Sequence, residues 1–355
     1  ALAGGEFNVN SPQQLADILF RKLGLKSGRK NRRGYSTNVE VLSELEDEHA
    51  IVPLILRYRE IAKLRSTYAL GMLPLVDEND KLHTVFRQAA TSTGRLSSTE
   101  PNLQNIPVRK AEGALIRKLF IASPGNVLVT ADYSQIELRL MAHFSGDGAM
   151  CAAFNAGTDI HTVTAAKVFR VPEYMVTPEM RRHAKAVNFG IIYGISEYGL
   201  AKDLGISRAR AREFIEGYFA TYPGVKKYMN EAIETAKEKG YVQTLFGRRR
   251  EVPELKAANA NQRAFGERVA LNMPLQGTAS DIIKLAMLNA AAKLKEGGYA
   301  SRLIMQVHDE LIIDAVPEEA EQMKKLLRDS MENVVQLKVK LEVEVGSGPN
   351  WLEAK

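Results

Sequence analysis

The sequence contains very little of what disulfide or zinc–thiolate chemistry needs, and its apolar runs are short. Its 355 residues include one cysteine, Cys151. A single cysteine excludes an intramolecular disulfide framework and any zinc site built from several cysteines, and it suits a reducing compartment. We find no run of about 18 apolar residues and no signal peptide. The sequence therefore predicts a soluble, intracellular protein with no membrane partner.

The excess of positive over negative charge is also small. Lys and Arg number 48 against 42 for Asp and Glu, so the net charge is +6, and the pI is about 9.2. Clusters of basic residues are therefore more informative than the total. In residues 26–34 five of nine positions are Lys or Arg, and the others favour a turn. Two interpretations stay open: a solvated loop, or a flexible loop that binds phosphate groups.

The hydrophobic content, 45% of the chain, is enough for a large core in two or three subdomains. Residues 1 to about 76 have a helical and charged pattern, and residues 77 to about 136 have short strands and loops. A second helical part extends to about residue 271, and strands return after it. This order predicts an α+β protein in which the chain leaves a sheet domain, forms a helical insertion and returns.

Local patterns predict three further elements. Residues 47–72 have apolar positions at helical spacing, which predicts one helix with a single buried stripe: Ile51, Leu54, Ile55, Tyr58, Ile61, Ala62 and Leu64. Residues 207–240 predict two helices that are divided at Pro223. Alternation of apolar and charged residues predicts a half-buried strand through Val339, Leu341, Val343 and Val345.

Three acidic residues follow or interrupt strongly apolar stretches. Asp309 and Glu310 lie within residues 303–313, where the pattern predicts two strands and a tight turn. Asp132 ends the strand-like run 126–131. An unpaired carboxylate in such a place is costly to desolvate, and a divalent cation removes that cost. Carboxylates at two strand ends, far apart in sequence, are what a two-metal phosphoryl-transfer site needs.

A basic and aromatic row lies on the helix predicted for residues 178–194. Arg181, Lys185, Phe189 and Tyr193 recur every four residues, so they drift by about 40° per step and share one face over about 18 Å. A nucleoside triphosphate has a matching array of phosphates and a flat base. The alternative is an amphipathic core helix with solvated basic ends. Gly190, inside this helix, predicts a bend or a close approach of another segment.

Residues 91–107 form a polar, turn-forming segment with almost no core residues. Its hydroxyl and amide groups suit phosphate oxygens and base edges. An ordinary surface loop has the same composition, so composition alone leaves both interpretations open.

Taken together, these segments resemble the polymerase domain of family A DNA polymerases, the bacterial DNA polymerase I type. The similarity covers essentially the whole chain, and the motifs have the order and approximate spacing of the family. They lie in residues 93–98, 102–107, 132–139, 181–193, 241–250, 273–279 and 307–310. Each motif alone is a weak signal, and the complete ordered set is a specific one.

The resemblance implies a right-hand fold and a reaction. We expect an N-terminally truncated thumb in residues 1–76, a palm in residues 77–140 and 272–355, and fingers in residues 141–271. The chain would lack the first thumb helix, a short palm segment and any exonuclease domain. The implied reaction is template-directed addition of dNTPs to a primer 3′-hydroxyl with release of pyrophosphate. The implied partners are primer-template DNA and dNTPs, and the implied state is a monomer, nucleoid-associated in a bacterial cytoplasm or within an organelle.

The resemblance also implies the catalytic centre. Asp132, Asp309 and the Tyr133 carbonyl would ligate two Mg²⁺ ions, for which Mn²⁺ can substitute. Glu310 would support this catalytic site rather than act as a principal ligand. Lys185 would bind the phosphates and protonate the leaving pyrophosphate.

Further binding residues follow from the same resemblance. Those implied for the nucleotide are Arg181, Lys185, Phe189, Tyr193, Gln135, His161 and Glu137, the last as a steric gate against a ribose 2′-hydroxyl. By itself, His161 is compatible with a structural role, and Glu137 with a surface acid. Those implied for DNA, partly through the minor groove, whose acceptors are common to all correct pairs, are Arg95, Gln104, Asn105, Arg268, Asn272, Gln276, His308, Arg29 and Lys30.

Three alternatives share part of this pattern. A single-subunit RNA polymerase shares the aspartates and the Arg/Lys helix, but Glu137, residues 93–95 and residues 276–278 favour the DNA enzyme. A non-catalytic primer-template binding module would be indicated by loss of Asp132 or Asp309, and both are present. A nuclease would need a separate acidic cluster, and none remains.

Overall fold

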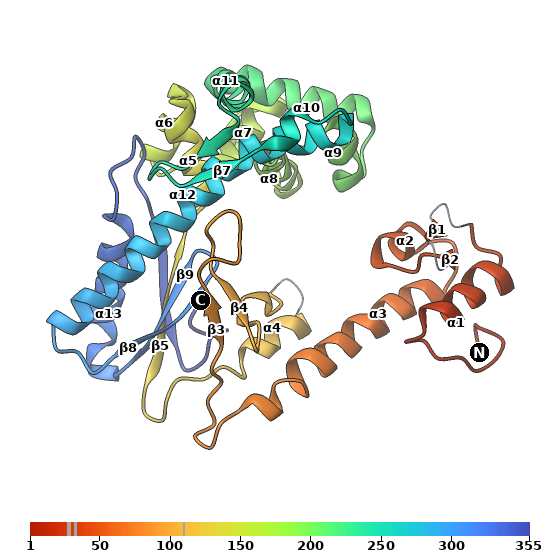
Figure 1. The fold of residues 1–355 in the computed structure, drawn as a ribbon, viewed down its shortest axis with the longest axis horizontal. Helices are drawn as coiled ribbons and strands as arrows, with labels where there is room; N and C mark the ends of the chain where they lie inside the picture. Colours follow the sequence, from red (N-terminus) through yellow and green to blue (C-terminus); the bar gives the residue numbers. More distant parts are fainter. Residues whose placement is uncertain (27–29, 32–33, 109–110) are drawn as a thin grey trace. The chain divides into compact units, whose positions relative to one another are not determined.

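The computed structural model describes residues 1–26, 30–31, 34–108 and 111–355. Their Cα positions form two compact units (Figure 1). The first unit comprises Ala1–Thr84 and Ile106–Ile116, and the second comprises Val85–Asn105 and Arg117–Lys355. The predicted DNA-binding residue Arg29 lies outside the described residues.

The first unit is built mainly from short helices. Ser11 and Asn38 cap two of them, because each side chain accepts a backbone N–H of the following turn. The elements are α1 (Pro12–Ala16), α2 (Val39–Glu44), α3 (Ile51–Lys63) and α4 (Ala111–Arg117), with π-helical turns at Asp17–Lys22 and Leu64–Ala69 and a hairpin of β1 (Lys30–Asn31) and β2 (Gly34–Tyr35).

The buried stripe predicted for α3 is wrong in part. Ile51 and Ile55 are buried against the core formed with α1 and α2, but Leu54, Tyr58 and Ile61 are 60%, 42% and 47% exposed. The apolar positions of α3 spread around more than one face, and the short helices α1 and α2 are packed only on the face through Ile51 and Ile55. Sequence spacing cannot show how much of a long helix its neighbours cover.

The second unit contains a four-stranded antiparallel sheet in the order β10-β5-β9-β8. Its strands are β5 (Val127–Tyr133), β8 (Arg302–Val307), β9 (Glu310–Ala315) and β10 (Val343–Gly348). Strands β8 and β9 form a hairpin whose turn is His308 and Asp309, which confirms the prediction for this region. Its register aligns Asp132 of β5 with Glu310 of β9.

Strand β10 is shorter than the alternating pattern predicted, because it begins at Val343. Val339 and Leu341 are buried but precede the strand. The backbone there bonds elsewhere: the Lys340 carbonyl accepts an N–H of Arg139 at 2.6 Å, and the Glu342 carbonyl accepts the Ser134 N–H at 2.9 Å.

One group of helices packs against the sheet, and a second group lies beyond one end of it (Figure 1). The long helix α12 links the two regions, since it contacts α5 and α11 as well as α13 and β8. These helices are α5 (Ile136–Ser145), α6 (Gly148–Asn155), α7 (Ile160–Phe169), α8 (Pro178–Ile192), α9 (Glu197–Leu204), α10 (Arg208–Thr221), α11 (Pro223–Lys239), α12 (Ala260–Glu296) and α13 (Ala320–Glu332).

The predicted helix around residues 178–194 is present as α8. It begins where the Thr177 hydroxyl accepts the Met180 N–H at 3.2 Å and Pro178 takes the first helical position. A Cβ on Gly190 would lie 2.8 Å from Ile195 Cγ2, so the glycine permits the predicted close approach. The division of α10 from α11 at Pro223 is also as predicted.

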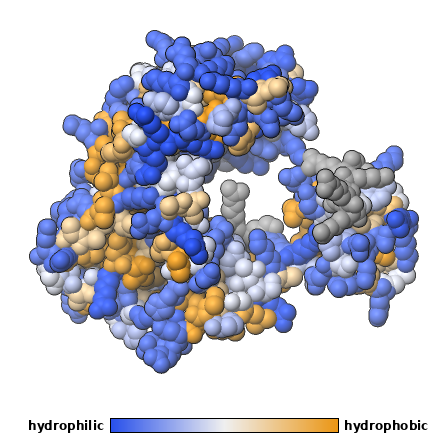
Figure 2. Space-filling view, viewed as in Figure 1, coloured by the Kyte–Doolittle hydropathy of each residue, from blue (hydrophilic) through white to orange (hydrophobic). Residues whose placement is uncertain are grey.

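Two small hairpins complete the second unit: β3 (Val85–Arg87) with β4 (Ser97–Thr99), and β6 (Tyr241–Gln243) with β7 (Arg249–Glu251). Figure 2 shows mostly hydrophilic residues over α10 and α11. Exposed apolar side chains elsewhere include Leu288 on α12 and Ile304 on β8. Within the described ranges no helix is both long enough and apolar enough to span a membrane.

Candidate active site

The predicted metal carboxylates meet at one end of the sheet. Asp132 is the next-to-last residue of β5, and Asp309 lies in the turn that joins β8 to β9. The Tyr133 N–H donates to the Asp309 carbonyl at 3.1 Å, so backbone hydrogen bonding holds the two strand ends together. His308 takes the left-handed φ of 53° that the tight turn requires.

Asp309 lies in a largely acidic environment. Its pKa is raised to about 6, mainly by burial and also by the nearby carboxylates of Glu137 and Asp132, while Arg95 opposes the shift. Loss of a proton would therefore add charge to an already acidic site, and a bound cation would relieve this. Among the described residues no group of three or more His, Cys, Asp or Glu side chains could hold a metal ion. The oxygen atoms here that could hold a hard cation are those of the two aspartates and of the nearby backbone carbonyls.

Glu310 is in a different environment from the two aspartates. Its side chain is 3% exposed, and three neighbours surround it: Trp351 Nε1 donates to Oε1 at 3.1 Å, Lys355 Nζ lies 3.2 Å from Oε2, and Arg117 Nη1 lies 3.8 Å from Oε2. Burial raises the pKa of Glu310, although Lys355 opposes the shift. Because protein groups already hold its oxygens, the arrangement favours a supporting role over direct ligation.

Lys355 also contacts Asp132. Its Nζ lies 2.9 Å from Asp132 Oδ2, so one ammonium group bridges carboxylates from β5 and β9. Burial would lower the pKa of Lys355, but Glu310 and Asp132 together raise it, so the group stays charged. Neither Lys355 nor Arg117 and Trp351 was predicted from the sequence. Their approach to the site depends on packing between segments more than 200 residues apart, such as Asp132 and Lys355.

Glu137 joins the predicted loop and helix residues. It is 5% exposed, which excludes a surface acid, and lies in the first turn of α5 after Gln135, whose φ of 49° is left-handed. Arg95 Nη2 donates to Glu137 Oε1 at 2.8 Å, and the Tyr193 hydroxyl donates to Oε2. Burial and the Glu137 carboxylate raise the pKa of Tyr193, so its phenol remains a donor.

The loop that carries Arg95 is fixed against α12. Gly94 has a φ of 82°, and a Cβ there would lie 2.6 Å from Arg248 Nε. Arg248 in turn bonds Asp281 Oδ1 through Nε at 2.9 Å and Nη2 at 2.6 Å, and Lys284 donates to the Gly94 carbonyl. The glycine is therefore needed both for its backbone angle and for the space that Arg248 fills.

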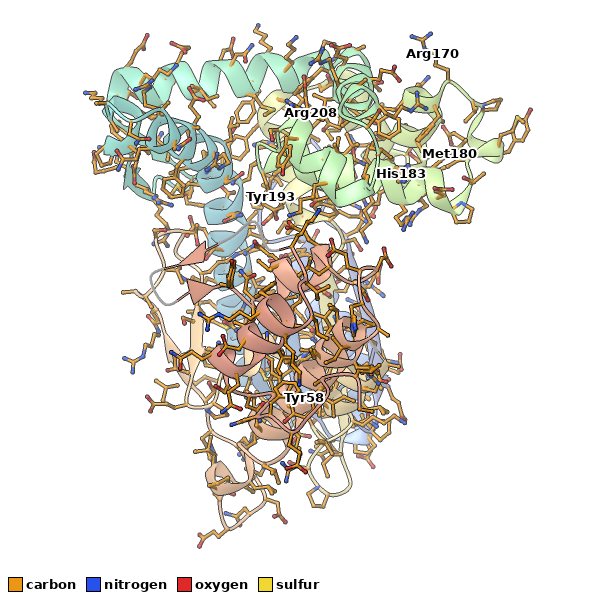
Figure 3. All side chains as sticks on the ribbon, turned by 90° about the vertical axis from the view of Figure 1, so that its right-hand side faces the viewer. Tyr58, Arg170, Met180, His183, Tyr193 and Arg208 are labelled. Carbon is orange, nitrogen blue, oxygen red and sulfur yellow. The ribbon has the colours of Figure 1, made fainter. Side chains whose placement is uncertain are left out.

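On α8 the predicted phosphate-binding residues are accessible. Arg181 and Lys185 are exposed, Phe189 is half-buried and Tyr193 is 38% exposed. Figure 3 shows Tyr193 near the opposite end of α8 from Met180 and His183. Arg181 Nε lies 2.5 Å from Asp159 Oδ2, the N-cap residue of α7, whereas Lys185 forms no hydrogen bond or ion pair with any described residue.

His161 packs beneath α8 and is 1% exposed. Its Nδ1 lies 2.9 Å from Asn188 Nδ2, and its ring centroid lies 5.7 Å from that of Phe189. Burial lowers its pKa to about 4, with Asp159 opposing the shift and the charges of Arg181 and Lys185 adding to it. The imidazole is therefore neutral at neutral pH and contacts α8 from the α7 side.

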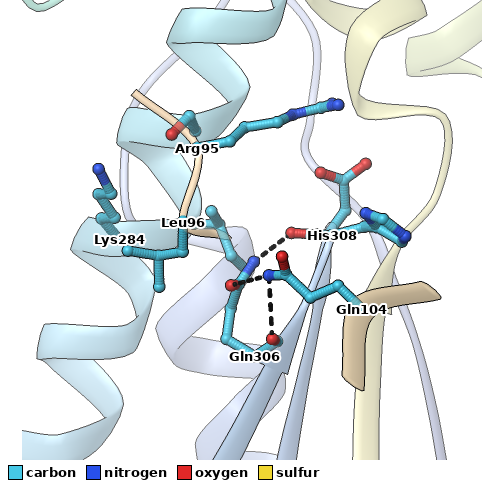
Figure 4. Close-up of a pocket in the computed structure, with 9 residues that line it drawn as sticks. Arg95, Leu96, Gln104, Lys284, Gln306 and His308 are labelled. Carbon is cyan, nitrogen blue, oxygen red and sulfur yellow. Dashed lines mark hydrogen bonds between the residues drawn. The ribbon is translucent and has the colours of Figure 1, made fainter. Parts of the chain in front are cut away.

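Several of the predicted DNA-binding residues line a small, open hollow next to Asp309 (Figure 4). Gln104 Nε2 donates to Gln306 Oε1 at 3.2 Å, and Gln306 Nε2 donates to the His308 carbonyl. Gln306 and Lys284, which were not predicted, also line it. The full lining is Arg95, Leu96, Gln104, Ser280, Ile283, Lys284, Gln306, His308 and Asp309.

Four other predicted DNA-binding residues are not part of this lining, although α12 and the 3₁₀-helix that carry them contribute other residues to it. Arg268, Asn272 and Gln276 recur every four residues on α12 and share one of its faces. Asn272 Oδ1 is buried and has no hydrogen-bond partner among the described residues. Asn105 ends a short 3₁₀-helix, Leu103–Asn105. The backbone of Lys30 lies in β1, and its side chain is outside the description.

A four-stranded antiparallel sheet with aspartates at one end, linked by a long helix to a helical region, is the architecture of a polymerase domain. The structure is similar to the POL domain of Pol1 from M. smegmatis, solved in complex with DNA primer-template and dNTP. The TM-score is 0.94 at 43% sequence identity, over 99% of this chain and 63% of that one. The expected α+β, right-hand polymerase fold is confirmed by this match.

The sequence profile described as DNA polymerase family A matches residues 1–353, so the chain belongs to that family. It is 53% identical to DNA polymerase I of Caldicellulosiruptor bescii over 355 residues, which are 100% of this chain and 42% of the relative. It is also 53% identical to DNA polymerase I of Geobacillus stearothermophilus over 356 residues, or 41% of that relative. The chain thus spans about two fifths of the length of these curated relatives. Membership of the family implies dependence on a divalent metal.

Proposed function

We propose that this chain catalyses template-directed DNA synthesis, adding dNTPs to a primer 3′-hydroxyl and releasing pyrophosphate. The observation that carries the proposal is the meeting of Asp132 and Asp309 at adjacent strand ends of the sheet, in a chain whose α8 exposes Arg181 and Lys185. Carboxylates for metals and cations for phosphates are the two requirements of nucleotidyl transfer. Membership of DNA polymerase family A supports it.

Two Mg²⁺ ions would be held by Asp132, Asp309 and the Tyr133 carbonyl, and Mn²⁺ can substitute for them. The raised pKa of Asp309 and the all-oxygen donor set support this assignment. When bound, the ions lower the pKa of the primer hydroxyl and stabilise charge on the pyrophosphate. Glu310, held by Trp351, Arg117 and Lys355, keeps β9 in register beside Asp132.

The nucleotide site would combine α8 with the first turn of α5. Arg181 and Lys185 bind the phosphates, and Lys185 supplies a proton to the leaving pyrophosphate. Phe189 packs on the incoming sugar and base, and Tyr193 occupies the template position before the nucleotide binds.

The α5 side of that site would select the sugar. Glu137 is fixed by Arg95 and Tyr193, so a ribose 2′-hydroxyl directed at it meets a carboxylate that cannot move aside. Gln135 contacts the nucleotide from the turn between Tyr133 and Glu137. His161 completes the nucleotide site from beneath α8, next to Phe189.

The duplex end would lie along the hollow and the polar face of α12. Side-chain donors there can contact minor-groove acceptors without reading the sequence. The unpartnered Oδ1 of Asn272 supports a ligand on this face. The residues proposed for it are Arg95, Gln104, Asn105, Arg268, Asn272, Gln276 and His308, with Arg29 and Lys30 on the backbone phosphates.

We assign the thumb to residues 1–76, the palm to residues 77–140 and 272–355, and the fingers to residues 141–271. The working unit is a monomer that binds primer-template DNA and dNTPs. The proposed place of the chain is a bacterial cytoplasm, in association with the nucleoid, and the bacterial source of the relatives supports the cytoplasmic part.

An RNA-polymerase-like enzyme is the second candidate because it needs the same aspartates and cations. The buried Glu137 argues against it, since a fixed carboxylate at the sugar disfavours ribonucleotides. A non-catalytic binding module is the third candidate, and the intact pair Asp132 and Asp309 argues against it.

Single-nucleotide primer extension with Mg²⁺ tests the proposal, with the templated dNTP and the matching rNTP in parallel reactions. Fast addition of dNTP only supports DNA synthesis and the gate. Equal use of both favours the RNA-polymerase alternative, and duplex binding without extension leaves the binding module. Glu344 lies on β10, directly opposite Asp132 of β5. E344Q is therefore a matched carboxylate control that should extend normally.

A further inference from the structure

One lysine side chain lies where a cation would be expected between two of the site's carboxylates. Lys355 Nζ is 2.9 Å from Asp132 Oδ2 and 3.2 Å from Glu310 Oε2. Asp132 and Glu310 are register partners on adjacent strands, and like charges directly opposite each other destabilise a sheet. The ammonium group therefore neutralises a repulsion that the strand register creates.

The packing of residues 350–355 fixes the position of Lys355. Trp351 is fully buried, and its backbone N–H donates to the Phe120 carbonyl at 2.9 Å. The Ala354 carbonyl accepts the Thr130 hydroxyl at 2.8 Å. A Cβ on Gly346 would lie 2.2 Å from the Ala354 carbonyl oxygen, so this strand glycine leaves the space in which the segment lies. The segment is therefore held by contacts that do not involve the ion pair.

The two carboxylates differ in what they would lose if Lys355 moved. Glu310 keeps Trp351 Nε1 and Arg117 as partners, and its side chain is 3% exposed. Asp132 is 39% exposed, and Lys355 is its one ion-pair partner among the described residues. A cation that approaches from solvent can therefore displace Lys355 from Asp132 while the lysine stays at Glu310.

We propose that Lys355 is an internal competitor of the divalent metal at Asp132. In the metal-free chain its ammonium group neutralises Asp132 and Glu310, and metal binding requires it to release Asp132 Oδ2. Lys355 then acts as a positioning residue. Before metal binds, it reduces the electrostatic repulsion between the two carboxylates, and it thereby lowers the affinity of the site for metal. This inference rests on the proposed function, because it takes Asp132 as a metal ligand.

Mn²⁺ binding to the free chain, followed by electron paramagnetic resonance, tests the competition without any catalytic readout. We expect K355M to bind Mn²⁺ about twofold to fivefold more tightly than the wild type, since an ion pair of this exposure is worth about that factor. K355R should stay close to the wild type because it keeps the charge. K325M is the matched control: Lys325 also pairs with an aspartate, Asp329, on α13 away from the site, and its loss should change nothing.

Thermal unfolding of the metal-depleted chain, in buffer from which the chelator has been removed, gives a second readout. K355M should unfold at a lower temperature than the wild type without metal, and added Mn²⁺ should raise its midpoint more than it raises that of the wild type. K355Q, which keeps a polar side chain, should behave in the same way and replaces K355M if that variant folds poorly.

The outcomes separate this inference from the proposed function. D132N should bind Mn²⁺ more weakly than the wild type, and if it does not, the metal assignment of the proposed function is wrong. If D132N is weaker but K355M and K355Q bind no more tightly than the wild type, the metal site stands and the role of Lys355 is overturned. Weaker binding by K355M would likewise contradict competition.

Discussion

The strand-end site and helix α8 contribute to the same proposed reaction but are built differently. At the strand ends, Asp132 and Asp309 are held by backbone pairing, and neighbouring Glu310 is almost fully enclosed by protein groups. On α8, Arg181 and Lys185 are exposed, and one partly exposed ion pair with Asp159 holds the first of them. The groups proposed for chemistry are thus placed by the backbone before anything binds, whereas those proposed for the substrate are exposed side chains, which suits induced fit.

The two regions also differ in what their arrangement costs the folded chain. The strand-end site keeps acidic groups close together and partly away from water, and the raised pKa of Asp309 measures that cost. The side chains of Arg181 and Lys185 on α8 are exposed and stay hydrated, so they cost little folding free energy before a ligand binds. Substitutions in the two regions should therefore have different signatures in catalysis, binding and stability.

The largest expected effect is at the strand ends. D132A or D309A should lower the rate of single-turnover primer extension by about a thousandfold or more, because each removes a ligand for the metals that carry the chemistry. Duplex affinity, measured by fluorescence anisotropy, should change by less than about threefold. The control E344Q should extend at the wild-type rate. Extension by either Ala variant near that rate would contradict the two-metal assignment.

On α8 the loss should be smaller and divided between binding and chemistry. K185A should lower kcat about a hundredfold, since it removes a proton donor as well as a phosphate contact. R181A should act mainly through the KM for dNTP. Arg182, the neighbouring residue, is 73% exposed and only 4.0 Å from Glu179, so R182A controls for loss of helix charge. Equal effects of R181A and R182A would contradict a specific role for Arg181.

At the junction of the two regions, Glu137 should control the choice of sugar. E137A should raise the use of rNTP relative to dNTP about 10-fold to 100-fold, because it removes the fixed carboxylate facing the sugar. Y193F removes one of the two groups that fix Glu137 but keeps the carboxylate and Arg95, so it should raise the same ratio of kcat/KM less than E137A does. A ratio unchanged in E137A would remove Glu137 as the gate.

The stability cost at Asp309 predicts a pH dependence. Its pKa is about 6 in the folded chain against the ordinary value of 3.8, so the folded state binds the proton more tightly than the unfolded state does. The stability from this group is fully present below pH 3.8 and is lost as the pH rises through about 6. In EDTA at pH 8, D309N should therefore be more stable than the wild type by about 1–2 kcal/mol, less than the full shift because the group is partly solvated.

Urea unfolding at pH 8 and at pH 4 measures this difference. The advantage of D309N should shrink or vanish at the lower pH. A variant that is less stable than the wild type at pH 8 without metal would show that Asp309 has a stabilising partner instead of an uncompensated charge.

The smallest expected effect is on the ion pair that holds Arg181. D159N should change the KM for dNTP by only about twofold to fivefold and leave kcat unaltered, because a partly exposed ion pair contributes little. Glu197, which pairs with Arg212 on neighbouring helices, supplies the control E197Q. A fall in kcat of D159N comparable to that of R181A would mean that α8 is held as firmly as the strand ends.

Local patterns predicted much of this molecule. The β8–β9 hairpin, α8 and the division of α10 from α11 follow from side-chain periodicity and turn residues, which act over a few positions. The family followed from several motifs in order. The approach of Asp132 to Asp309 was expected because both lie at strand ends, but only the sheet order brings those ends together.

The wrong or missing predictions all depend on distant contacts. The face of α3 that is covered depends on how far α1 and α2 extend, and β10 is shortened because Arg139 binds the Lys340 carbonyl. Lys355 has no periodic pattern or motif around it, and its place depends on a glycine in β10 that leaves room for the preceding residue. Such features need the packed structure.

Trp351 is the single tryptophan of the chain, and its ring lies 3.9 Å from the Arg117 guanidinium while its N–H binds Glu310. Fluorescence excited at the red edge of protein absorption therefore comes from one place. That place is connected to Asp132 through two side chains, Glu310 and Lys355. The intrinsic emission of the unlabelled chain is thus a spectroscopic probe of its catalytic end, and metal titrations can be followed by light without adding a dye.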